Sequence, residues 1–530
     1  MKKYDFEDLT IYFEGEIYKS EEYEKNNSAE ILKDLYIKYS FDFVSKLDGV
    51  FAFCIYDKIK GLYFCSRDRF GNIPFYYHIK NEKFIFSTSI KDILKELPNL
   101  PKLNKIALSK YIQHFSTFGE DTFYCDIFKL EDSSYLIFEP KKDLIKKKYY
   151  KINTYKAVND ENIALNDLEE LLYSAIEKRL ISSPSTLLSG GVDSSLISSI
   201  YTKISGRKID TFSIGYNEYK NYCELQYAKI TSNHINSNHH EIIIDKKNYI
   251  DSFYNTLEFF DEPHGDSAAV PLNFLLKNVK DFGVNSLLSG EGADELFFGY
   301  DNYAKFLKYH NFGKSLSKEQ NEFLNEIISA LQNNTKESEY LRRVVKKQNI
   351  YNSFGEIFND IQKRKLFVKV PTFKSETPKQ DFVDNMSYID LKLWVSNPVL
   401  TKVYKVSKEN SLQIHTPFLD NDLLKYVFSI ESSIKMGNTN KYLLKKIASK
   451  YIPEQIINRT KKGFNSPFNE WLQDEFGSSI LDTILEVNRQ TGFFNENYLK
   501  QIYTLASSNK FKQHLYSLFV FSLWYKKVYL

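Results

Sequence analysis

Short apolar runs, separated by Gly, Asn or charged turns, fill the first part of the chain and predict β-strands. They are rich in aromatic and β-branched residues and read GVFAFCIYD (49–57), GLYFCSRD (61–68), PFYYHI (74–79) and KFIFSTS (83–89). We expect an antiparallel sheet, with ILKDLYIKY (31–39) as a helix beside it. Nearer the start, LTIYF (9–13) predicts another strand that ends in a tight turn at Glu14-Gly15-Glu16.

The pattern changes at about residue 160. ALNDLEELLYSAIEKRL (164–180) has Leu and Ile at helical spacing, with Asn166 or Asp167 as the expected N-cap. Short apolar strands that end in polar, Gly-rich loops then alternate with helical segments, which predicts a parallel sheet with ligands at the carboxyl ends of its strands. The stretch from about 310 to 530 is expected to be mostly helical.

Composition narrows the class of protein. A chain of 530 residues is too long for one core, and we predict two domains, residues 1–150 and 160–530, joined near the charged surface stretch 140–151. The 39 Tyr and 42 Phe residues accompany a net charge of only +3, which favours aromatic cores over a nucleic-acid surface. No apolar run has the length of a membrane helix, and MKKYDFEDLT does not resemble a secretory signal. The four scattered cysteines fit a reducing compartment, so we expect a cytoplasmic protein.

The strongest chemical signal is SGGVDSS, Ser189 to Ser195, which follows an apolar strand. Its glycines allow a sharp turn that presents N–H groups, and its serines begin a helix whose positive end faces the same point. Such a loop binds phosphate, and Asp193 suits a Mg²⁺ ion beside pyrophosphate. The loop lacks the Lys of the GxxxxGK[ST] motif.

A second loop of the same kind is SGEGADELFFGY, Ser289 to Tyr300, with three carboxylates within five residues. In a parallel sheet its strand end can face the first loop, so we expect Asp193 and Asp294 to hold one Mg²⁺ ion. Glu291 is then available for proton transfer or for orienting a nucleophile.

A third segment, NRTKKGFNSPFNEWL (458–472), has Lys461 and Lys462 before a Gly turn, where one of them can stabilise charge on an acyl phosphate. HINSNHHE (234–241) has histidines at a spacing typical of metal sites. Because no second ligand cluster accompanies it in the sequence, we favour a structural role over zinc.

These three loops, in this order, resemble the synthetase domain of the asparagine synthetase family. DEPHGDSAAVPL (261–272), SLQIHTPFLDNDLL (411–424) and KMGNTNKYLLK (435–445) extend the resemblance, and residues 47–77 resemble the family's glutaminase domain. SGGxDS alone is shared with other ATP pyrophosphatases. The resemblance implies an α/β protein: a truncated N-terminal-nucleophile-type αββα sandwich, then a parallel-sheet ATP-pyrophosphatase domain of the adenine-nucleotide α-hydrolase type, with a helical C-terminal part.

The resemblance also implies cofactors and residue roles. The family adenylates a carboxylate with ATP and Mg²⁺, releases pyrophosphate and forms an amide. Lys461, with Lys462 as the alternative, would neutralise charge in adenylation, and Glu291 would serve amide formation. The residues implied to bind ATP or pyrophosphate are Leu187, Ser189, Gly190, Gly191, Asp193, Ser194, Ser195, Ser289, Gly290 and Asp294.

The sequence departs from the family in the glutaminase part. Position 2 is Lys instead of the nucleophilic Cys, and Glu14 replaces an Asn whose amide would stabilise an oxyanion. Ala29 replaces an Asp that would hold the glutamine amino group. About fifty residues that precede this region in the family, including an Arg for the glutamine carboxylate, have no counterpart in the sequence. We therefore expect no glutamine hydrolysis.

The acyl-substrate region departs as well. Tyr404, Lys405, Gln413 and His415 stand where the family usually has Asp, Arg, Glu and Arg. This change beside retained ATP loops predicts the same activation of a different carboxylate, and we expect these four residues to contact the substrate.

The sequence thus predicts an ATP-dependent, AMP-forming amide synthetase that joins a small-molecule or peptide carboxylate to an amine or ammonia without glutamine. A lasso-type peptide macrocyclase and a natural-product or sugar amide synthetase both fit, whereas β-lactam synthetases have Tyr at the position of Glu291. An ammonia-dependent asparagine synthetase is the alternative within the family, and an ATP-binding pseudoenzyme or assembly partner the alternative outside it. We expect no nucleic-acid or membrane partner; a homodimer and a partner protein from the same gene cluster both stay open.

Overall fold

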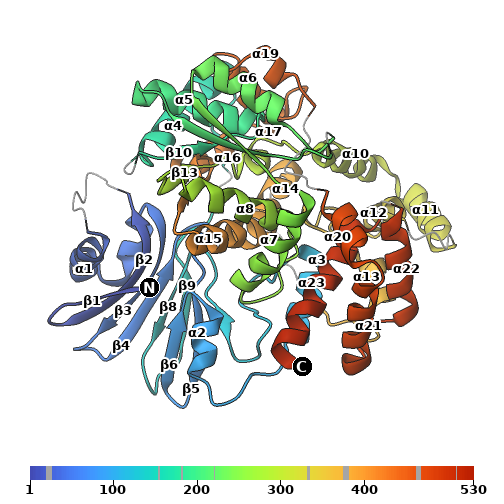
Figure 1. Ribbon diagram of the computed structural model, residues 1–530, viewed down its shortest axis with the longest axis horizontal. Helices are drawn as coiled ribbons and strands as arrows, with labels where there is room; N and C mark the ends of the chain where they lie inside the picture. The colour runs from blue at the N-terminus through green and yellow to red at the C-terminus, as the bar shows by residue number, and fades with distance from the viewer. Residues whose placement is uncertain are drawn as a thin grey trace.

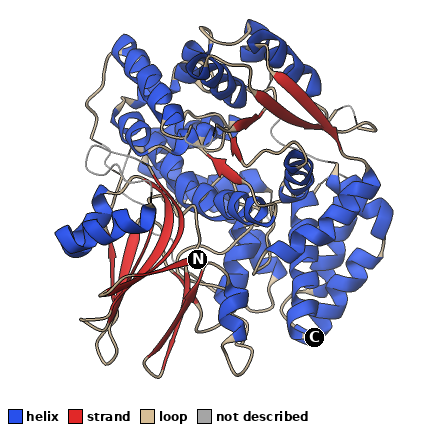
Figure 2. Ribbon diagram, turned by 60° about the vertical axis from the view of Figure 1, so that its left-hand side comes forward, coloured by secondary structure: helices blue, strands red, loops and turns tan. Residues whose placement is uncertain are grey.

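The computed structural model describes residues 1–18, 27–152, 155–180, 183–219, 221–330, 335–373, 381–460, 467–508 and 510–530. Figure 1 shows three parts: antiparallel sheets at the lower left, a parallel sheet with its helices at the top, and the last helices at the right. The strands are confined to the first two parts, and helices make up most of the rest (Figure 2).

The first sheet is antiparallel, with the strand order β1-β2-β3-β4-β8-β9. Its strands are β1 (Lys2–Asp5), β2 (Leu9–Ile17), β3 (Gly49–Asp57), β4 (Leu62–Arg67), β8 (Ser134–Phe138) and β9 (Ile145–Lys148). Helix α1 (Ser28–Tyr39), capped by the side chain of Asn27, packs its apolar residues on one face. The predicted strands at 49–57 and 61–68 and the helix at 31–39 are confirmed. Strand β9, which lies in the charged stretch 140–151, is exposed as expected.

The turn predicted at Glu14-Gly15-Glu16 is wrong, because strand β2 runs straight through it. Glu14 lies opposite Ala52 of β3, and Glu16 lies opposite Val50. Gly15 is required here for close packing: its φ is 119°, and a Cβ atom would lie 2.0 Å from the carbonyl oxygen of Val50.

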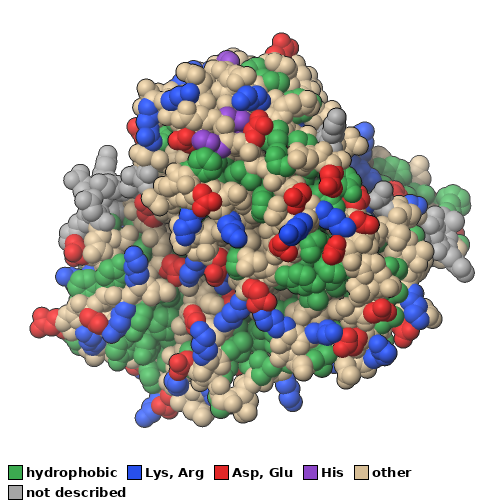
Figure 3. Space-filling view, in the orientation of Figure 1, with side chains coloured by type: hydrophobic (Ala, Val, Ile, Leu, Met, Phe, Trp, Pro, Cys, Tyr) green, Lys and Arg blue, Asp and Glu red, His purple; other side chains and the backbone are tan. Residues whose placement is uncertain are grey.

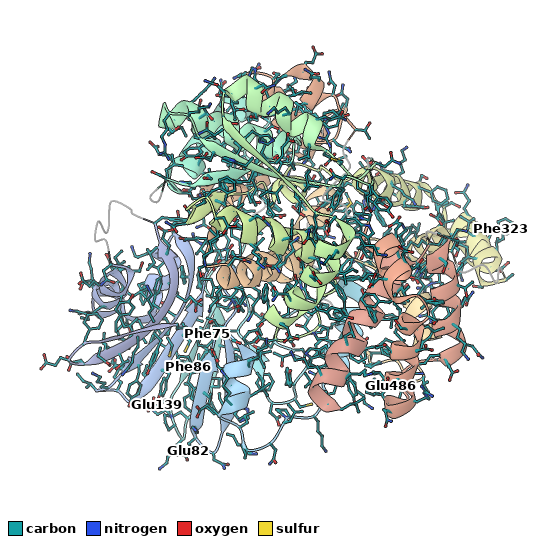
Figure 4. All side chains as sticks on the ribbon, in the orientation of Figure 1. Phe75, Glu82, Phe86, Glu139, Phe323 and Glu486 are labelled. Atoms are coloured by element: carbon teal, nitrogen blue, oxygen red, sulfur yellow. The ribbon has the colours of Figure 1, made fainter. Side chains whose placement is uncertain are left out.

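A second sheet, ordered β6-β5-β7, faces the first. It consists of β5 (Tyr76–Lys80), β6 (Lys83–Ser87) and β7 (Phe128–Lys129). Phe75 and Phe86 stack in the layer between the sheets, with their rings 5.7 Å apart (Figure 4). Helix α2 (Ile90–Lys95) packs against β5 and β6, and α3 (Lys105–His114) follows it. The αββα arrangement expected for this part is confirmed.

The parallel sheet has the order β12-β11-β10-β13-β14, and every neighbouring pair is parallel. Its strands are β10 (Ser185–Leu187), β11 (Asp210–Gly215), β12 (Asn238–Ile243), β13 (Ser286–Leu288) and β14 (Gln413–His415). The helices that follow its early strands are α5 (Val192–Ser205), α6 (Leu225–Ile235), α7 (Lys246–Phe259) and α8 (Ala269–Lys280). The preceding helix α4 (Glu161–Glu177) begins earlier than predicted, because Asp160 caps it and not Asn166 or Asp167.

The rest of the chain is helical, as predicted. It contains α9 (Ala293–Leu296), α10 (Asp301–Ser315), α11 (Lys318–Ala330), α12 (Lys336–Val345), α13 (Asp360–Leu366), α14 (Phe382–Asp390), α15 (Leu400–Glu409), α16 (Asn421–Ser429), α17 (Ser432–Met436), α18 (Tyr442–Ala448), α19 (Glu454–Ile457), α20 (Phe468–Phe476), α21 (Ser479–Thr491), α22 (Glu496–Ser507) and α23 (Lys512–Tyr529). A π-helical segment, Leu391–Val399, joins α14 to α15. The predicted α/β class, with a parallel sheet and a helical C-terminal part, is confirmed.

The two predicted domains share a hydrophobic core. Ile90 and Tyr111, from the first 150 residues, lie in the same buried cluster as Leu515 and Phe519 of α23. The hydroxyl of Tyr111 also donates to the carbonyl oxygen of Ser517, at 2.8 Å. The N-terminal part is therefore packed against the rest of the molecule through α2 and α3, and is not joined to it only by a linker.

Charged side chains of both signs are interspersed on the face that Figure 3 shows. Within the described ranges, no helix combines the length and the apolar character needed to cross a membrane.

Candidate active site

The first Gly-rich loop lies between β10 and α5, as predicted. Gly190 has a φ of 75°, and a Cβ atom there would lie 2.5 Å from the backbone nitrogen of Ala228. The hydroxyl of Ser194 accepts a hydrogen bond from the backbone N–H of Ser189 (3.1 Å) and lies 3.0 Å from the Ser189 hydroxyl. Gly191 is the N-cap of α5, so these two hydroxyls lie at the positive end of a helix, where an anion is stabilised.

Ser195 does not join this group. Its side chain is fully buried, and its hydroxyl lies 2.9 Å from the hydroxyl of Thr231 on α6. A serine one position further along the helix points about 100° away from its neighbour, which carries Ser195 toward the adjacent helix. The hydroxyl of Ser195 thus bonds within the protein, and its predicted contact with phosphate stays a prediction.

The second Gly-rich loop lies beside the first, because β10 and β13 are neighbours in the sheet. A Cβ atom on Gly290 would lie 3.0 Å from the Cβ atom of Asp193, so the two loops are in direct contact. The backbone N–H of Ser289 donates to the carbonyl oxygen of His415, at 2.9 Å, which ties this loop to β14. Leu187, at the end of β10, is half-buried beside them.

Asp193 and Asp294 converge on one cation, the ammonium group of Lys441. Its Nζ lies 2.5 Å from Asp193 and 2.7 Å from Asp294. Although burial lowers the pKa of Lys441, the two carboxylates outweigh it, so that the pKa is raised and the group is charged. Lys441 precedes α18 with a φ of 56°, a backbone conformation that is unfavourable for a lysine. The contact between Asp294 and Lys441 also requires a glycine at position 299, since a Cβ atom there would collide with the carboxylate of Asp294.

These carboxylates fit a magnesium ion. They come from different loops and already direct oxygen atoms at one point of positive charge. Mg²⁺ in nucleotide sites is typically held by one or two protein carboxylates, with phosphate oxygens and water as its other ligands. In the described part of the chain, no group of three or more His, Cys, Asp or Glu side chains forms a separate metal cluster.

Glu291 lies near a buried lysine. It is half-buried, and its charge raises the pKa of Lys402. The main influences on Lys402 are burial, which lowers its pKa, and Asp266, which raises it and accepts a hydrogen bond from it at 2.7 Å. The predicted acid–base candidate thus lies within electrostatic range of a buried positive charge.

Lys461 and Lys462 lie outside the described residues. Arg459, just before them, donates to the carbonyl oxygen of Gly190 at 2.8 Å and forms an ion pair with Glu224. The third segment therefore reaches the first loop at its beginning. Neither Arg459 nor Lys441 was singled out from the sequence, although both lie in segments that carry the resemblance.

A small polar chamber of about 20 Å³, partly open to solvent, lies between the N-terminal sheets and the parallel-sheet part. Its lining includes Tyr76, Ser116, Thr117, Lys129, Asp261, Glu262, His264, Thr401 and Lys405. Burial lowers the pKa of Lys129 to about 8 and raises that of Glu262 to about 7. A space of this size holds about one water-sized molecule.

Of the four predicted substrate residues, only Lys405 lines this chamber, and it is paired with Asp261. The hydroxyl of Tyr404 donates to Glu14 at 2.5 Å, and the amide of Gln413 donates to Glu16 at 3.0 Å. Burial and nearby Arg179 lower the pKa of His415 to about 3, so it is neutral at physiological pH. Their described partners therefore include residues of the N-terminal sheet, and contact with a substrate stays a prediction.

The histidines of residues 234–241 have ordinary partners. Nε2 of His234 lies 3.0 Å from the carbonyl oxygen of Tyr451, and Nδ1 of His239 lies 2.9 Å from the hydroxyl of Thr211. His240 lies 3.0 Å from a carboxylate oxygen of Asp210. These three contacts are with other groups of the protein, which agrees with the structural role favoured from the sequence.

Comparisons with known proteins agree with this geometry. A family model described as asparagine synthase matches residues 167–526, and one described as a glutamine amidotransferase domain matches residues 3–150. The chain is 28% identical to asparagine synthetase (glutamine-hydrolyzing) 1 of Bacillus subtilis, over 98% of this chain and 86% of that protein. It is 36% identical to the putative asparagine synthetase (glutamine-hydrolyzing) 2 of Methanocaldococcus jannaschii, over 56% of this chain and 60% of that protein.

A fungal protein is similar at lower identity. Amidase chry2 of Gibberella zeae is 22% identical, over 89% of this chain and 79% of that protein. The similarity of the bacterial and fungal relatives extends over most of the chain, including the N-terminal sheets. Since the first family match takes in well over half of the residues, the chain belongs to the asparagine synthetase family.

Proposed function

We propose that this protein is an ATP-dependent, AMP-forming amide synthetase that does not hydrolyse glutamine. The observation that carries the proposal is the convergence of Asp193 and Asp294 on one cation between two Gly-rich loops. That arrangement suits a nucleoside triphosphate. The loops would bind its phosphates through backbone N–H groups and the hydroxyls of Ser189 and Ser194. Mg²⁺ held by the two carboxylates would supply neutralisation of the pyrophosphate charge.

The proposed reaction has two steps. A carboxylate oxygen of the substrate attacks the α-phosphorus of ATP, the bond to the β-phosphate oxygen breaks, and pyrophosphate leaves. An amine nitrogen then attacks the acyl carbon, AMP leaves with the electron pair of the broken C–O bond, and the nitrogen gives up a proton. Glu291, beside Lys402, is the group proposed to accept or orient that proton. Lys461, outside the described residues, is proposed to neutralise charge in the first step.

Two observations support the absence of glutamine hydrolysis. Glu14 places a carboxylate in the strand where the family's oxyanion donor is expected, and a negative charge there repels an oxyanion. Cys54 and Cys65 are fully buried between the N-terminal sheets, which removes them as nucleophiles. The nitrogen would therefore come from ammonia or from a substrate amine.

The class of the substrate acid is proposed from the way the acyl-substrate region differs from the family pattern. Lys405 is tied to Asp261, and His415 is uncharged, so the acyl region differs in charge from the pattern that the resemblance implies. This favours an acid other than aspartate, in a peptide, a natural product or a sugar acid. When acid and amine belong to one molecule, the same chemistry closes a lactam, as in a lasso-type macrocycle.

Ammonia-dependent asparagine synthesis is the second candidate. It is favoured by the names of the curated relatives, which are asparagine synthetases. The small chamber beside Lys405 also has room for a molecule of the size of ammonia. All four cysteines are free, which fits the reducing cytoplasm that we propose as the location of the protein.

The nitrogen source is tested by incubating the protein with ATP, Mg²⁺ and either ammonium or glutamine, together with a panel of carboxylic acids that includes aspartate. We expect AMP and an amide with ammonium or an added amine, and no glutamate released from glutamine. Glutamate release at a catalytic rate would contradict the glutamine-independent assignment. Asparagine as the main product would select the second candidate.

A further inference from the structure

The carboxylate of Glu14 joins the N-terminal sheet to helix α15. One of its oxygens accepts hydrogen bonds from the hydroxyl of Tyr404 at 2.5 Å and from the ammonium of Lys408 at 2.6 Å. The other accepts from the hydroxyl of Thr88 at 2.9 Å. Only 19% of the Glu14 side chain is exposed, whereas 44% of the Lys408 side chain is, so the contact lies at the edge of a buried interface.

The contacts lie on one face of α15. Thr401, Tyr404, Lys405 and Lys408 follow the spacing i, i+3, i+4 and i+7, which brings their side chains to the same side of the helix. On that side Tyr404 and Lys408 meet Glu14, while Lys405 reaches the carbonyl oxygen of Thr88 and the carboxylate of Asp261. The N-terminal part therefore contacts α15 at two points, Glu14 and Thr88.

The adjacent face of α15 is buried, and the helix packs against α8 and β14, the strand whose last residue is bonded to the second Gly-rich loop. Lys402 is buried there, with its ammonium on Asp266 and its charge close enough to Glu291 to be affected by it. Val406, one turn further, packs in the core beneath the parallel sheet. Because a helix turns as a unit, a rotation allowed by losing the Glu14 contacts would displace Lys402.

We propose that Glu14 is a positioning residue for amide formation, acting through α15 to hold Lys402 beside Glu291. The inference deepens the proposed function and rests on it. An Asn at position 14, as in the glutaminase pattern, is one methylene shorter and uncharged, so it could neither span the same gap nor compensate Lys408. The change that removes the oxyanion donor thus provides the contact that orients the helix.

The test separates the two half-reactions in three variants. Glu14→Gln removes the charge, Glu14→Asp retains it on a shorter arm, and Lys408→Met removes the partner. Glu139→Gln is the matched control, since Glu139 lies in the same sheet region and pairs with Lys142 away from α15 (Figure 4). The readouts are carboxylate-dependent ATP–pyrophosphate exchange and the rate of amide formation with ammonium, using the panel acid that gives the fastest exchange.

We expect Glu14→Gln to retain exchange within about twofold and to lose amide formation on the order of tenfold, because a small displacement of an acid–base group is costly. Lys408→Met should give the same split, the double variant should be no worse than either single one, and Glu14→Asp should recover part of the rate. Glu139→Gln should behave as the wild type. If Glu14→Gln does not fold, Tyr404→Phe removes a single hydroxyl from the same contact and takes its place.

Two results overturn the inference, and they differ in meaning. Unchanged amide formation in Glu14→Gln, or a parallel fall of exchange and amide formation, shows that Glu14 does not act on the second step. Absence of exchange in the wild-type protein with every acid of the panel instead refutes the proposed function, and this inference falls with it.

Discussion

The ammonium group of Lys441 lies 2.5 Å from the carboxylate of Asp193. The same ammonium also reaches Asp294, so residues that are more than a hundred positions apart along the chain share one charged contact. The loops after β10 and β13 are thereby tied to the start of α18. The two carboxylates that we propose to hold the cation are thus brought together by a lysine.

Removing the charge of Lys441 should destabilise the two loops that carry Asp193 and Asp294. In Lys441→Met, the two carboxylates face each other without compensation, and we expect the free energy of unfolding to fall by about 3 kcal/mol, the usual cost of breaking a buried pair. Mg²⁺ should restore much of this loss, and should stabilise the variant more than the wild type. Thermal unfolding with and without Mg²⁺ measures both effects. Equal stabilisation of the two proteins by Mg²⁺ would show that the carboxylates do not hold the ion.

The two loop acids should act at different steps. We expect Asp294→Asn to lower ATP–pyrophosphate exchange by about 10²-fold, since it removes a ligand for the cation that neutralises the phosphates. Glu291→Gln should keep the exchange and lose amide formation, because it changes only the group proposed for proton transfer. Exchange and amide synthesis are measured on the same preparations. Loss of exchange in Glu291→Gln would move that residue to the first step.

The contribution of Glu14 to stability should depend on pH. Burial alone would raise its pKa, but the bonds from Lys408 and Tyr404 outweigh burial and lower the pKa from 4.5 to about 2. A depressed folded-state pKa adds stability that is fully present above about pH 4.5 and is lost as the pH falls toward 2.

Glu14→Gln should therefore be less stable than the wild type by about 3 kcal/mol at pH 7, and the difference should narrow below pH 4. Urea unfolding at several pH values gives both curves, with Glu139→Gln as the control. A difference that does not change between pH 7 and pH 3 would show that the charge of Glu14 is not the source.

The shared core makes the N-terminal sheets necessary for folding. A chain of residues 151–530 would expose the part of α23 that Ile90 and Tyr111 cover, including Leu515 and Phe519. We expect this fragment to aggregate when expressed alone. Gel filtration and circular dichroism check the outcome, and a monomeric, cooperatively unfolding fragment would contradict it.

Much of the site could be predicted because each of its Gly-rich loops is a short continuous run of sequence that follows an apolar strand. The strand expected at 49–57 coincides with β3, and the alternation of strands and helices after residue 160 was enough to bring Asp193 and Asp294 to one edge of a sheet. Both depend on local patterns, which the chain itself displays.

What could not be predicted depends on partners far away in the sequence. Glu14-Gly15-Glu16 has the composition of a turn, yet it stays extended because β3 pairs with it along its whole length. The contacts of Tyr404 with Glu14 and of Gln413 with Glu16 could not be predicted, because these partners lie about four hundred residues earlier. Lys441 was missed for the same reason, since its position in a left-handed backbone conformation follows from tertiary contacts.

The central claim is that the protein activates a carboxylate with ATP. Its most direct test is the exchange of labelled pyrophosphate into ATP in the presence of Mg²⁺ and single acids from a panel of amino acids, peptides and sugar acids. We predict that at least one acid gives exchange well above the acid-free rate, and that Asp294→Asn lowers this exchange by about 10²-fold. Binding of ATP without exchange for any acid would contradict the claim and leave a nucleotide-binding protein without this chemistry.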